Sequence, residues 1–324
     1  MEICRRGSAC SPSSFLFLIL FLLFISSSFP SLTLSASFRC HPDDKNALLN
    51  IKKSIDIPKD SYVPWDPNTD CCEWEDVTCD PNTNRVTGLE FRMITVFGQI
   101  PASISNLPYL ETFVLALLKN DKLPGCIPDS FAKLHNLKRL EISWSPLSCR
   151  TPEFLGQLKN LEYLDLSHNK LHGPIPSSLA NLSKLVHLRL NDNKLTGRIP
   201  NSLSALNVEL IDLSFNKLTG DASMFLRADG KVKDILLTGN RLDFDMSMVG
   251  FPKNLKALHI GGNRIRGRIP EQVTELKRLE AFDVSFNRLC GRIPVGGNMQ
   301  KLIASYFYHN RCLCGLPLPN KCKS

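Results

Sequence analysis

Carboxylate side chains recur at one position of a repeating pattern in this chain, and pairs of carboxyl groups are what glycosidases use as acid and base. Asp165 and Asp212 each stand between two apolar residues of the pattern. The two carboxyls of a glycosidase lie about 5 to 9.5 Å apart. These aspartates are two repeats apart on a surface that we expect to be open, and no pocket is indicated that would raise the pKa of either. We therefore expect that the protein is not an enzyme.

Histidine and cysteine spacing gives no better case for a metal or a cofactor. The seven histidines include no H-E-x-x-H pair. Zinc bound by Cys71, Cys72 and Cys79 is the competing interpretation, but adjacent cysteines do not give the pair spacing of a zinc site. An even number of cysteines behind a signal peptide indicates disulfides instead. The expected disulfide cysteines are Cys40, Cys71, Cys72, Cys79, Cys126, Cys149, Cys290, Cys312, Cys314 and Cys322.

The first residues have the pattern of a secretory signal peptide. Arg5 and Arg6 precede an apolar run over 15–25, and small residues follow up to Ala36. The run is too short for a membrane-spanning helix, which needs about 20 apolar residues. We predict a signal peptide over 1–36 and a secreted, extracellular protein.

The chain is basic, with a formal net charge of +8. It stays basic when Arg5, Arg6 and Glu2 are removed with the signal peptide. A basic secreted surface attracts polyanions at low salt, and an acidic wall polysaccharide fits that as well as a nucleic acid does. The alternative is that the excess of lysine and arginine only keeps the protein soluble.

The elements that must position these residues are repeats with a period of 23 or 24 residues, which is within the range of leucine-rich repeats. The clearest marker is an asparagine that can bond neighbouring backbone groups from a buried position. It occurs at Asn169, Asn193, Asn216, Asn240, Asn263 and Asn287. We predict an α/β solenoid, a right-handed leucine-rich repeat superhelix with a concave parallel β-sheet and disulfide-bonded caps at both ends.

Domain boundaries follow from the repeats. We predict an N-terminal cysteine-rich cap over 37–85, nine to ten repeats over 86–302 and a C-terminal cap over 303–324. In the cap, Pro42 should begin a helix with an apolar face that ends at Ile55. The sixth and seventh repeats lack the Gly-x-Ile-Pro turn that six of the other repeats carry, so we expect the solenoid to be irregular there.

The concave face is the predicted partner-binding surface, because alternate strand residues point away from the core. Five of nine residues in its central column are carboxylates, although the whole chain is basic. Such a face would attract a partner with a cationic cleft, with aromatic residues as apolar anchors. The predicted binding residues are Glu141, Ser143, Trp144, Asp165, Ser167, His168, Arg189, Asp192, Asp212, Phe215, His259, Asp283 and Phe286.

The cap sequence CCEWEDVTCD, repeats such as LSHNKLHGPIPSSL and the ending RCLCGLPLPNKC resemble plant polygalacturonase-inhibiting proteins over the whole mature chain. The chain is also similar to a leucine-rich antifreeze protein and to small floral proteins of the same build. The resemblance implies disulfides Cys40–Cys71, Cys72–Cys79, Cys290–Cys312 and Cys314–Cys322, and recognition by the concave strands.

Cys126 and Cys149 fall outside that pattern. They lie at nearly the same phase of adjacent repeats, and coils stacked about 4.8 Å apart bring such residues within disulfide range. We therefore predict a fifth, lateral disulfide between them.

The functional hypothesis is a secreted, monomeric protein of the cell wall whose concave face docks on a pectin-degrading polygalacturonase and inhibits it in plant defence. Its basic rim is expected to bind pectin and not a nucleic acid. A soluble co-receptor that binds a peptide or receptor ectodomain is one alternative, and an ice-binding protein is another. Asn181, in the sequence Asn-Leu-Ser, is a predicted glycosylation site on the convex side.

Overall fold

The structure, a computed structural model, describes residues 39–54, 65–95, 98–118 and 125–322. Residues 39–324 form one compact unit, which is the part described below. The predicted signal peptide and Ile55 lie outside the described residues.

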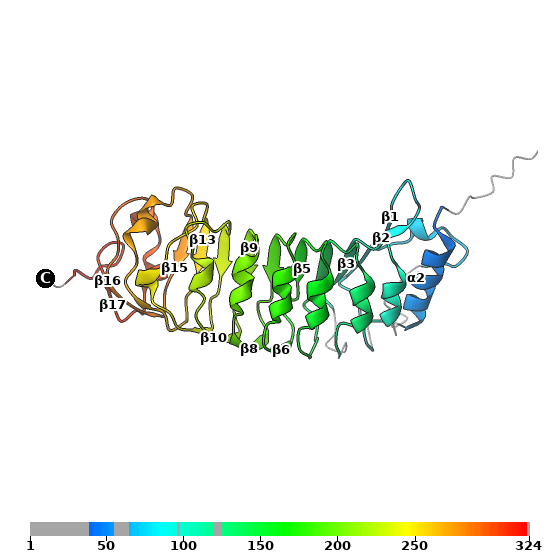
Figure 1. The fold of residues 1–324 in the computed structure, drawn as a ribbon, viewed down its shortest axis with the longest axis horizontal. Coiled ribbons are helices and arrows are strands. Elements are labelled where there is room, and N and C mark those ends of the chain that lie inside the picture. Colours follow the sequence, from blue (N-terminus) through cyan, green and yellow to red (C-terminus); the bar gives the residue numbers. More distant parts are fainter. Residues whose placement is uncertain (1–38, 55–64, 96–97, 119–124, 323–324) are drawn as a thin grey trace, which may run out of the picture. The chain divides into compact units, whose positions relative to one another are not determined.

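Nine parallel strands, one from each coil, form the main sheet (Figure 1). The short strand β1 (Val77–Cys79) adds a tenth strand, antiparallel to the first of them. The register carries equivalent residues onto one another, for example Leu164 opposite Leu188 and Leu188 opposite Ile211. The nine strands are β2 (Val86–Arg92), β3 (Thr112–Ala116), β4 (Arg139–Ser143), β5 (Tyr163–Asp165), β7 (His187–Arg189), β9 (Leu210–Asp212), β11 (Asp234–Leu236), β13 (Ala257–His259) and β15 (Ala281–Asp283).

A second set of short parallel strands follows one turn later in each coil from that of β5 onward. Four of them form one sheet, β6 (His172–Gly173), β8 (Lys194–Arg198), β10 (Lys217–Gly220) and β12 (Arg241–Leu242). Three more form another, β14 (Arg266–Gly267), β16 (Arg288–Arg292) and β17 (Cys312–Cys314). The break lies between β12 and β14, where only a single bridge joins Asp245 to Arg266. The predicted irregularity of the sixth and seventh repeats therefore takes the form of a broken second sheet.

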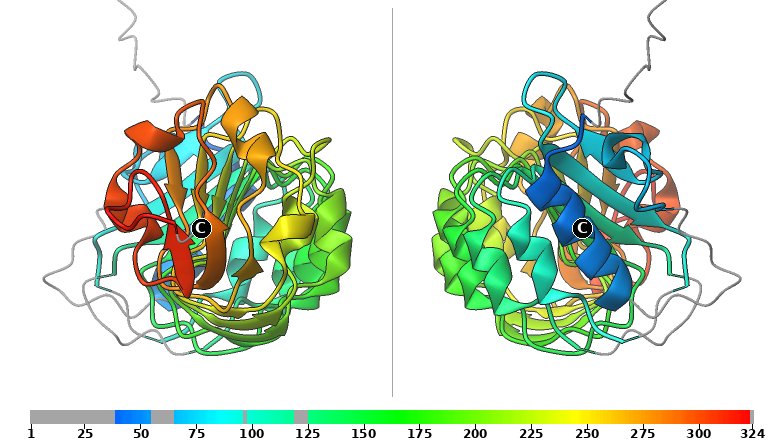
Figure 2. Two further views of the ribbon diagram at one scale, coloured as in Figure 1. Left: turned by 90° about the vertical axis from the view of Figure 1, so that its left-hand side faces the viewer. Right: turned by 90° about the vertical axis from the view of Figure 1, so that its right-hand side faces the viewer.

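Short 3-10 helices close most coils on the side opposite the main sheet (Figure 2). Proline precedes six of them, as Pro176 precedes η5, and its fixed φ suits the residue before a helical turn. The 3-10 helices are η1 (Cys71–Glu73), η2 (Ala102–Asn106), η3 (Asp129–Lys133), η4 (Glu153–Gln157), η5 (Ser177–Asn181), η6 (Asn201–Ala205), η7 (Ser223–Phe225), η8 (Met246–Met248), η9 (Glu271–Glu275), η10 (Met299–Lys301) and η11 (Ala304–Phe307).

The predicted asparagine ladder is present and bonds each coil to the one before it. The amide of Asn193 donates to the carbonyls of Leu166 in the preceding coil and of Leu190 and Asn191 in its own, and its oxygen accepts from Leu171 N at 2.9 Å. The other ladder asparagines repeat this arrangement. Because these groups are buried, the asparagine satisfies backbone atoms that an apolar residue would leave unpaired.

The N-terminal cap covers the first coil with α2 (Pro42–Ser54). Asp44 in its first turn is fully buried, and its carboxylate accepts from Arg85 Nη2 at 2.6 Å and from Val86 N at 2.8 Å. This aspartate therefore joins the cap to strand β2 as well as favouring the helix terminus. Trp65 and Trp74 stack in the same cap, with ring centroids 5.3 Å apart.

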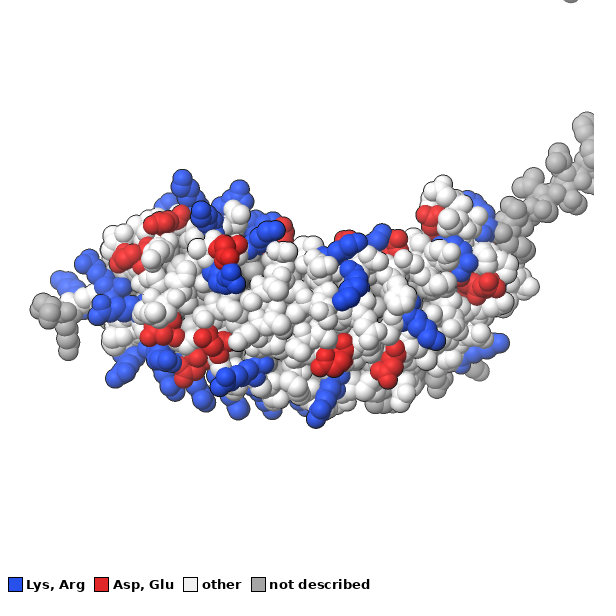
Figure 3. Space-filling view, viewed as in Figure 1, with Lys and Arg blue, Asp and Glu red and all other residues white. Residues whose placement is uncertain are grey.

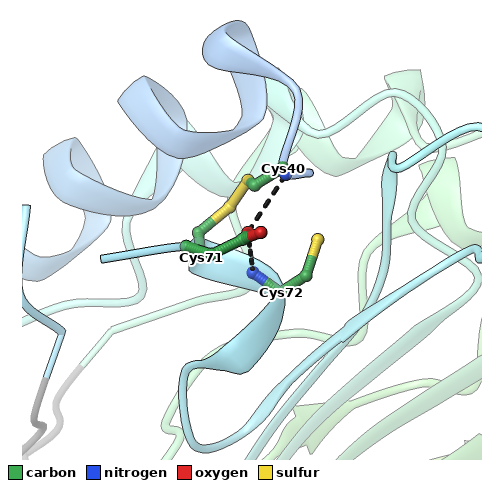
Figure 4. A group of neighbouring side chains, drawn as sticks. Cys40, Cys71 and Cys72 are labelled. Carbon is green, nitrogen blue, oxygen red and sulfur yellow. Dashed lines mark hydrogen bonds between the residues drawn. A yellow bond between two sulfur atoms is a disulfide. The ribbon is translucent and has the colours of Figure 1, made fainter. Parts of the chain in front are cut away.

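The four cap disulfides that the family resemblance implied are all formed. Cys40, Cys71 and Cys72 lie together beside the carboxylate of Asp70 (Figure 4). Their sulfurs are committed to disulfides, and Asp70 accepts from the backbone N–H groups of Arg39, Cys40 and Cys72. Burial works to raise the pKa of Asp70, but these hydrogen bonds outweigh it and lower the pKa. We therefore interpret the cluster as structural, because cysteines in disulfides offer no thiolate to a metal.

The predicted fifth disulfide is not formed, and Cys126 and Cys149 are free thiols. The two coils do stack there, since Ser148 N donates to Gly125 O at 3.3 Å. Burial and a hydrogen bond with Cys126 raise the pKa of the Cys149 thiol to about 12. The thiols are neighbours, but Cys126 is exposed and Cys149 is buried. Equal phase in adjacent coils was therefore not sufficient for the specific geometry of a disulfide.

No helix in the described part of the chain is both long enough and apolar enough to cross a membrane.

Candidate functional site

The candidate site is the outer face of the main sheet, which comprises the outward residues of its strands and the residues of the turn that follows each strand. In β4, Leu140 and Ile142 are buried in the core, so Glu141 and Ser143 point to the outer face. The same alternation places Asp165, Arg189, Asp212, His259 and Asp283 on this face.

Each coil has one residue with a positive φ directly before its ladder position, and this turn row borders the outer face. Glycine occupies the row in two coils, at Gly239 and Gly262. Side chains occupy it elsewhere, at Met93, Leu117, Trp144, His168, Asp192, Phe215, Phe286 and His309. A left-handed backbone at a bulky residue costs on the order of 1–3 kcal/mol and is concentrated at functional sites. The repeated cost therefore indicates that the exposed turn-row side chains have a role besides folding.

Three aromatic residues of the turn row are strongly exposed: Trp144 at 54%, Phe215 at 55% and Phe286 at 59%. The Trp144 ring stacks on His168 with centroids 3.8 Å apart, and the Phe286 ring stacks on His309 at 4.2 Å. The Phe215 ring lies over Gly239, where an added Cβ would come within 2.8 Å of it. Each ring is thus supported by the next coil, so its exposed surface is held in a fixed position.

Glu141 is not the uncompensated carboxylate that its place in a column of acidic residues suggested. Its side chain lies between Arg92, whose Nη1 donates at 3.2 Å, and Arg139, which donates to the other carboxylate oxygen. Burial works to raise the pKa of Glu141, but the hydrogen bonds from the two arginines outweigh it and lower the pKa. Arg139 also lies over the Tyr163 ring, 4.0 Å from its centroid. The N-terminal part of the outer face is therefore a charge-compensated network.

The carboxylates in the centre of the outer face accept hydrogen bonds from serine and tyrosine, not from arginine. Asp165 accepts from the N–H and the hydroxyl of Ser167, at 2.9 and 2.6 Å, and from the Tyr163 hydroxyl at 3.2 Å. Asp212 accepts from Ser214 N at 3.0 Å. Burial raises the pKa of Asp212 above its ordinary value, despite the hydrogen bonds from Ser214 and the nearby charge of Arg189. A cation brought against Asp212 would therefore be favourable.

Two buried polar atoms in the same area have no hydrogen-bond partner among the described residues. They are Arg189 Nε and Asn191 Oδ1. The amide nitrogen of Asn191 is already used, because it donates to Asp192 Oδ2 at 3.0 Å and lies 3.3 Å from His168 Nε2. Unsatisfied buried groups are costly and rare. They mark the centre of the outer face as a place where polar groups are held for something other than stability.

The structure places all thirteen predicted binding residues on the outer face or in its turn row, and their part in binding stays a prediction. Strand alternation also places Arg92, Tyr163 and Asn191 on this face, but it did not reveal which residues they contact. Arg92 contacts Glu141 across 49 residues of sequence, and no local pattern shows such a pairing. The repeat spacing alone would have been enough to extend the turn row to Met93 and Leu117.

The arrangement can bind, but it lacks the features of a catalytic centre. The carboxylates are held by hydrogen bonds to neighbouring serines, and none of the described histidines forms a group of metal ligands with them. What the face offers is fixed aromatic surface beside a group of carboxylates, which is the composition of a protein-binding surface.

Comparison with known proteins gives consistent results. A family profile described as the leucine rich repeat N-terminal domain matches residues 41–80, and one described as the Leucine Rich Repeat matches residues 160–182 and 184–206. A polygalacturonase inhibitor of Pyrus communis is 48% identical, with 95% of this chain and 98% of that protein covered. One of Vitis vinifera is 47% identical, with 89% and 93% covered. The crystal structure of a plant ice-binding protein matches with a TM-score of 0.75 and 36% identity, over 88% of this chain and 99% of that one.

Proposed function

The chain belongs to the leucine-rich repeat family of the polygalacturonase inhibitors, whose members are inhibitor proteins and not enzymes, and from this premise we propose that it inhibits a polygalacturonase by docking its outer face over the substrate cleft. The observation that carries the proposal is the turn row, with its exposed rings of Trp144, Phe215 and Phe286 held rigidly beside the carboxylates of the outer face. Rigid aromatic side chains contribute contact area at little entropic cost.

The charge of the outer face fits such an enzyme. A polygalacturonase must hold an anionic substrate, so its cleft must be cationic. Asp165, Asp192, Asp212 and Asp283 would present negative charge to the rim of that cleft, in place of the substrate's carboxylates. Complementary charge of this kind chiefly raises the association rate and sets specificity.

The direct test is inhibition of a panel of fungal polygalacturonases by purified protein, measured as the release of reducing sugar. Against an enzyme that is inhibited, Asp212→Asn and Trp144→Ala should each weaken inhibition about tenfold or more, the loss of roughly 1.4 kcal/mol that marks an important interface residue. Glu271→Gln, on the exposed helix η9 across the coil, is the matched control and should change nothing.

Two results would contradict the proposal. If no enzyme of a broad panel is bound or inhibited, the partner is wrong. If inhibition is strong but depends on Glu271 and not on Asp212 or Trp144, the partner is right and the surface is wrong.

We also propose that the protein is secreted to the cell wall and glycosylated at Asn181. Four disulfides suit an oxidising compartment. Asn181 is exposed at the end of η5, on the side of the coil opposite the outer face. A glycan there would leave docking unhindered. Wall polysaccharide is the second proposed ligand, since the whole chain is basic whereas the outer face is acidic.

Ice binding is the alternative that a specific observation favours, namely the similarity to the plant ice-binding protein. The outer face argues against it as the ice-binding surface, because its carboxylates and projecting rings are neither flat nor weakly charged. A measurement of thermal hysteresis separates the two functions, and a clear hysteresis without inhibition would establish the alternative.

A further inference from the structure

The seventh coil lacks the helical turn that closes a regular coil on the convex side, opposite the main sheet. In the fourth coil, η5 begins eight residues after the ladder asparagine Asn169 and ends twelve residues after it. The same interval after Asn240 covers 248–252, with the sequence Met-Val-Gly-Phe-Pro. Glycine and proline both disfavour a helix, and the chain is not helical over 249–252. The irregular sequence of this repeat therefore removes a helical turn from the convex side.

A cavity of about 420 Å³ lies where this turn is missing. Three successive coils line it. Ala228 comes from the sixth coil, Gly250 and Phe251 from the seventh, and the eighth coil contributes residues of η9 and of the turn after it. The volume is within the range of about 300–1,000 Å³ that is usual for small-molecule sites. The cavity is therefore large enough for a small organic ligand.

Close packing between the coils holds the walls and the floor of the cavity in place. A Cβ added at Gly250 would lie 3.3 Å from Ala228 N, so the sixth and seventh coils approach each other closely there. On the floor, Phe251 is 4% exposed and Leu276 is 5% exposed. The Phe251 ring packs edge-on against the Phe282 ring, with centroids 6.1 Å apart. The cavity thus has a preformed apolar floor.

The rim of the cavity is cationic. Lys253, Lys277 and Arg278 are exposed there, whereas Glu275 is the one carboxylate among the described residues that line the cavity. None of the three cations forms an ion pair or a side-chain hydrogen bond with another described residue. Figure 3 shows lysine and arginine gathered at the upper left of the view, where yellow and orange segments lie in Figure 1. The rim therefore attracts an anion.

We propose that this cavity binds a small organic anion with an apolar body, of the class of the aryl carboxylates. The apolar body lies on Phe251 and Leu276, because burial of apolar surface drives the binding of such ligands. The carboxylate lies at the rim, where Arg278 binds it in a bidentate geometry and Lys277 binds it as a point charge. An uncharged ligand would leave the cations without a partner, and an inorganic anion would leave the apolar floor uncovered.

This site is independent of the proposed function. The cavity lies on the convex side of the coils, and the outer face lies on the opposite side. A ligand in the cavity therefore leaves the outer face free.

The test is a fluorescence titration of the full-length protein with anilinonaphthalene sulfonate, an aryl anion that becomes fluorescent in an apolar site. The double substitution Lys277→Gln and Arg278→Gln should weaken its binding about tenfold or more, because two charge-assisted contacts are lost. The matched control, Lys194→Gln and Arg241→Gln, removes the same charge from exposed positions outside the cavity. The control should leave the affinity within about twofold.

A second variant tests the cavity without changing its charge. Ala228 is exposed and lines the cavity, so the ring of Ala228→Phe should fill the site and weaken binding of the fluorescent probe about tenfold or more. An unchanged melting temperature shows that the variant is folded. In a competition experiment with the unsubstituted protein, cinnamate should displace the probe. Cinnamyl alcohol, which has the same apolar body without the charge, should not displace it.

Three results would overturn the proposal. Equal weakening by the two double variants would mean that net charge alone explains the binding. Equal displacement by cinnamyl alcohol and cinnamate would show that the site does not select an anion. Loss of probe binding in Trp144→Ala, with binding unchanged in both cavity variants, would place the probe on the turn row and not in the cavity.

Discussion

The exposed aromatic residues of the turn row combine a strained backbone with a solvent-exposed side chain. Phe215 has a φ of 53° and Phe286 a φ of 50°, and both are more than half exposed. Glycine would adopt this conformation without strain, and it does so at Gly239 and Gly262. The large side chains therefore contribute little to the fold, and the proposed docking accounts for them.

Replacing Phe215 with glycine tests this separation of stability from binding. The relief of backbone strain and the extra entropy that glycine gives the unfolded chain act in opposite directions, so unfolding in denaturant should change by less than about 1 kcal/mol. Inhibition should fall about tenfold or more. Met93→Gly is the control, because it relieves the same strain at the end of the row and outside the predicted binding set. A destabilised protein with unchanged inhibition would show that the ring serves the fold.

Asp76, in the loop before β1, provides a pH test in the N-terminal cap. Burial, with the charges of Glu75 and Glu90, raises the pKa of Asp76 to about 6. A raised pKa means that the folded state holds the proton more tightly than the unfolded state. The group's stabilising contribution is therefore complete below about pH 4 and is lost as the pH rises through 6.

Asp76→Asn removes that dependence. Asparagine keeps the shape of the side chain and tolerates the positive φ of 66° at this position. The substitution should raise the melting temperature by about 2 °C at pH 7.5, which corresponds to roughly 1 kcal/mol after allowing for solvent screening. At pH 4 the variant and the unsubstituted protein should have the same melting temperature. A difference of the same size at both pH values would rule out ionisation as the cause.

The ladder asparagines hold the coils together, and each one serves four backbone groups. Asn216 donates to the carbonyls of Leu190, Leu213 and Ser214, and its oxygen accepts from Leu195 N. Asn216→Ala should cost about 2–4 kcal/mol in chemical denaturation, because it leaves buried backbone groups unpaired in two coils. Asn201→Ala, at an exposed position of η6, should cost less than about 0.5 kcal/mol. Similar values for the two variants would show that the ladder is not a source of stability.

The coils were predictable because each is specified locally. The spacing of the asparagines and the Pro-terminated turns determines where strands such as β5 and helices such as η5 occur. Contacts between coils were less predictable. Two such contacts are the pairing of Glu141 with Arg92 and Arg139 and the burial of Asp44 against Arg85. They depend on side-chain rotamers, and most of them join residues that are 40 or more positions apart in the sequence. Cys126 and Cys149 show the same limit. Their equal position in adjacent repeats makes them neighbours, but no disulfide joins them.

The distribution of charge over the molecule affects how the proposed partner approaches. The chain is basic overall, with a net charge of +8, while its outer face carries Asp165, Asp192, Asp212 and Asp283. Exposed basic residues directly follow the ladder asparagines, as Lys194, Lys217 and Arg241 do, so they border the turn row on the neighbouring sheet. A cationic enzyme that approaches the outer face is attracted by the carboxylates and repelled by these basic residues.

This opposition predicts faster association when the basic residues are replaced. The variant Lys194→Gln, Lys217→Gln and Arg241→Gln should associate about twofold faster with a polygalacturonase that has a cationic cleft, because a repulsive field has been removed. The gain should be largest near 0.01 M salt, where the Debye length is about 30 Å, and should vanish near 1 M, where it is about 3 Å. Stopped-flow association rates measure it, and the dissociation rate should not change. Slower association of this variant would mean that the enzyme contacts these basic residues, so that they form part of the docking surface.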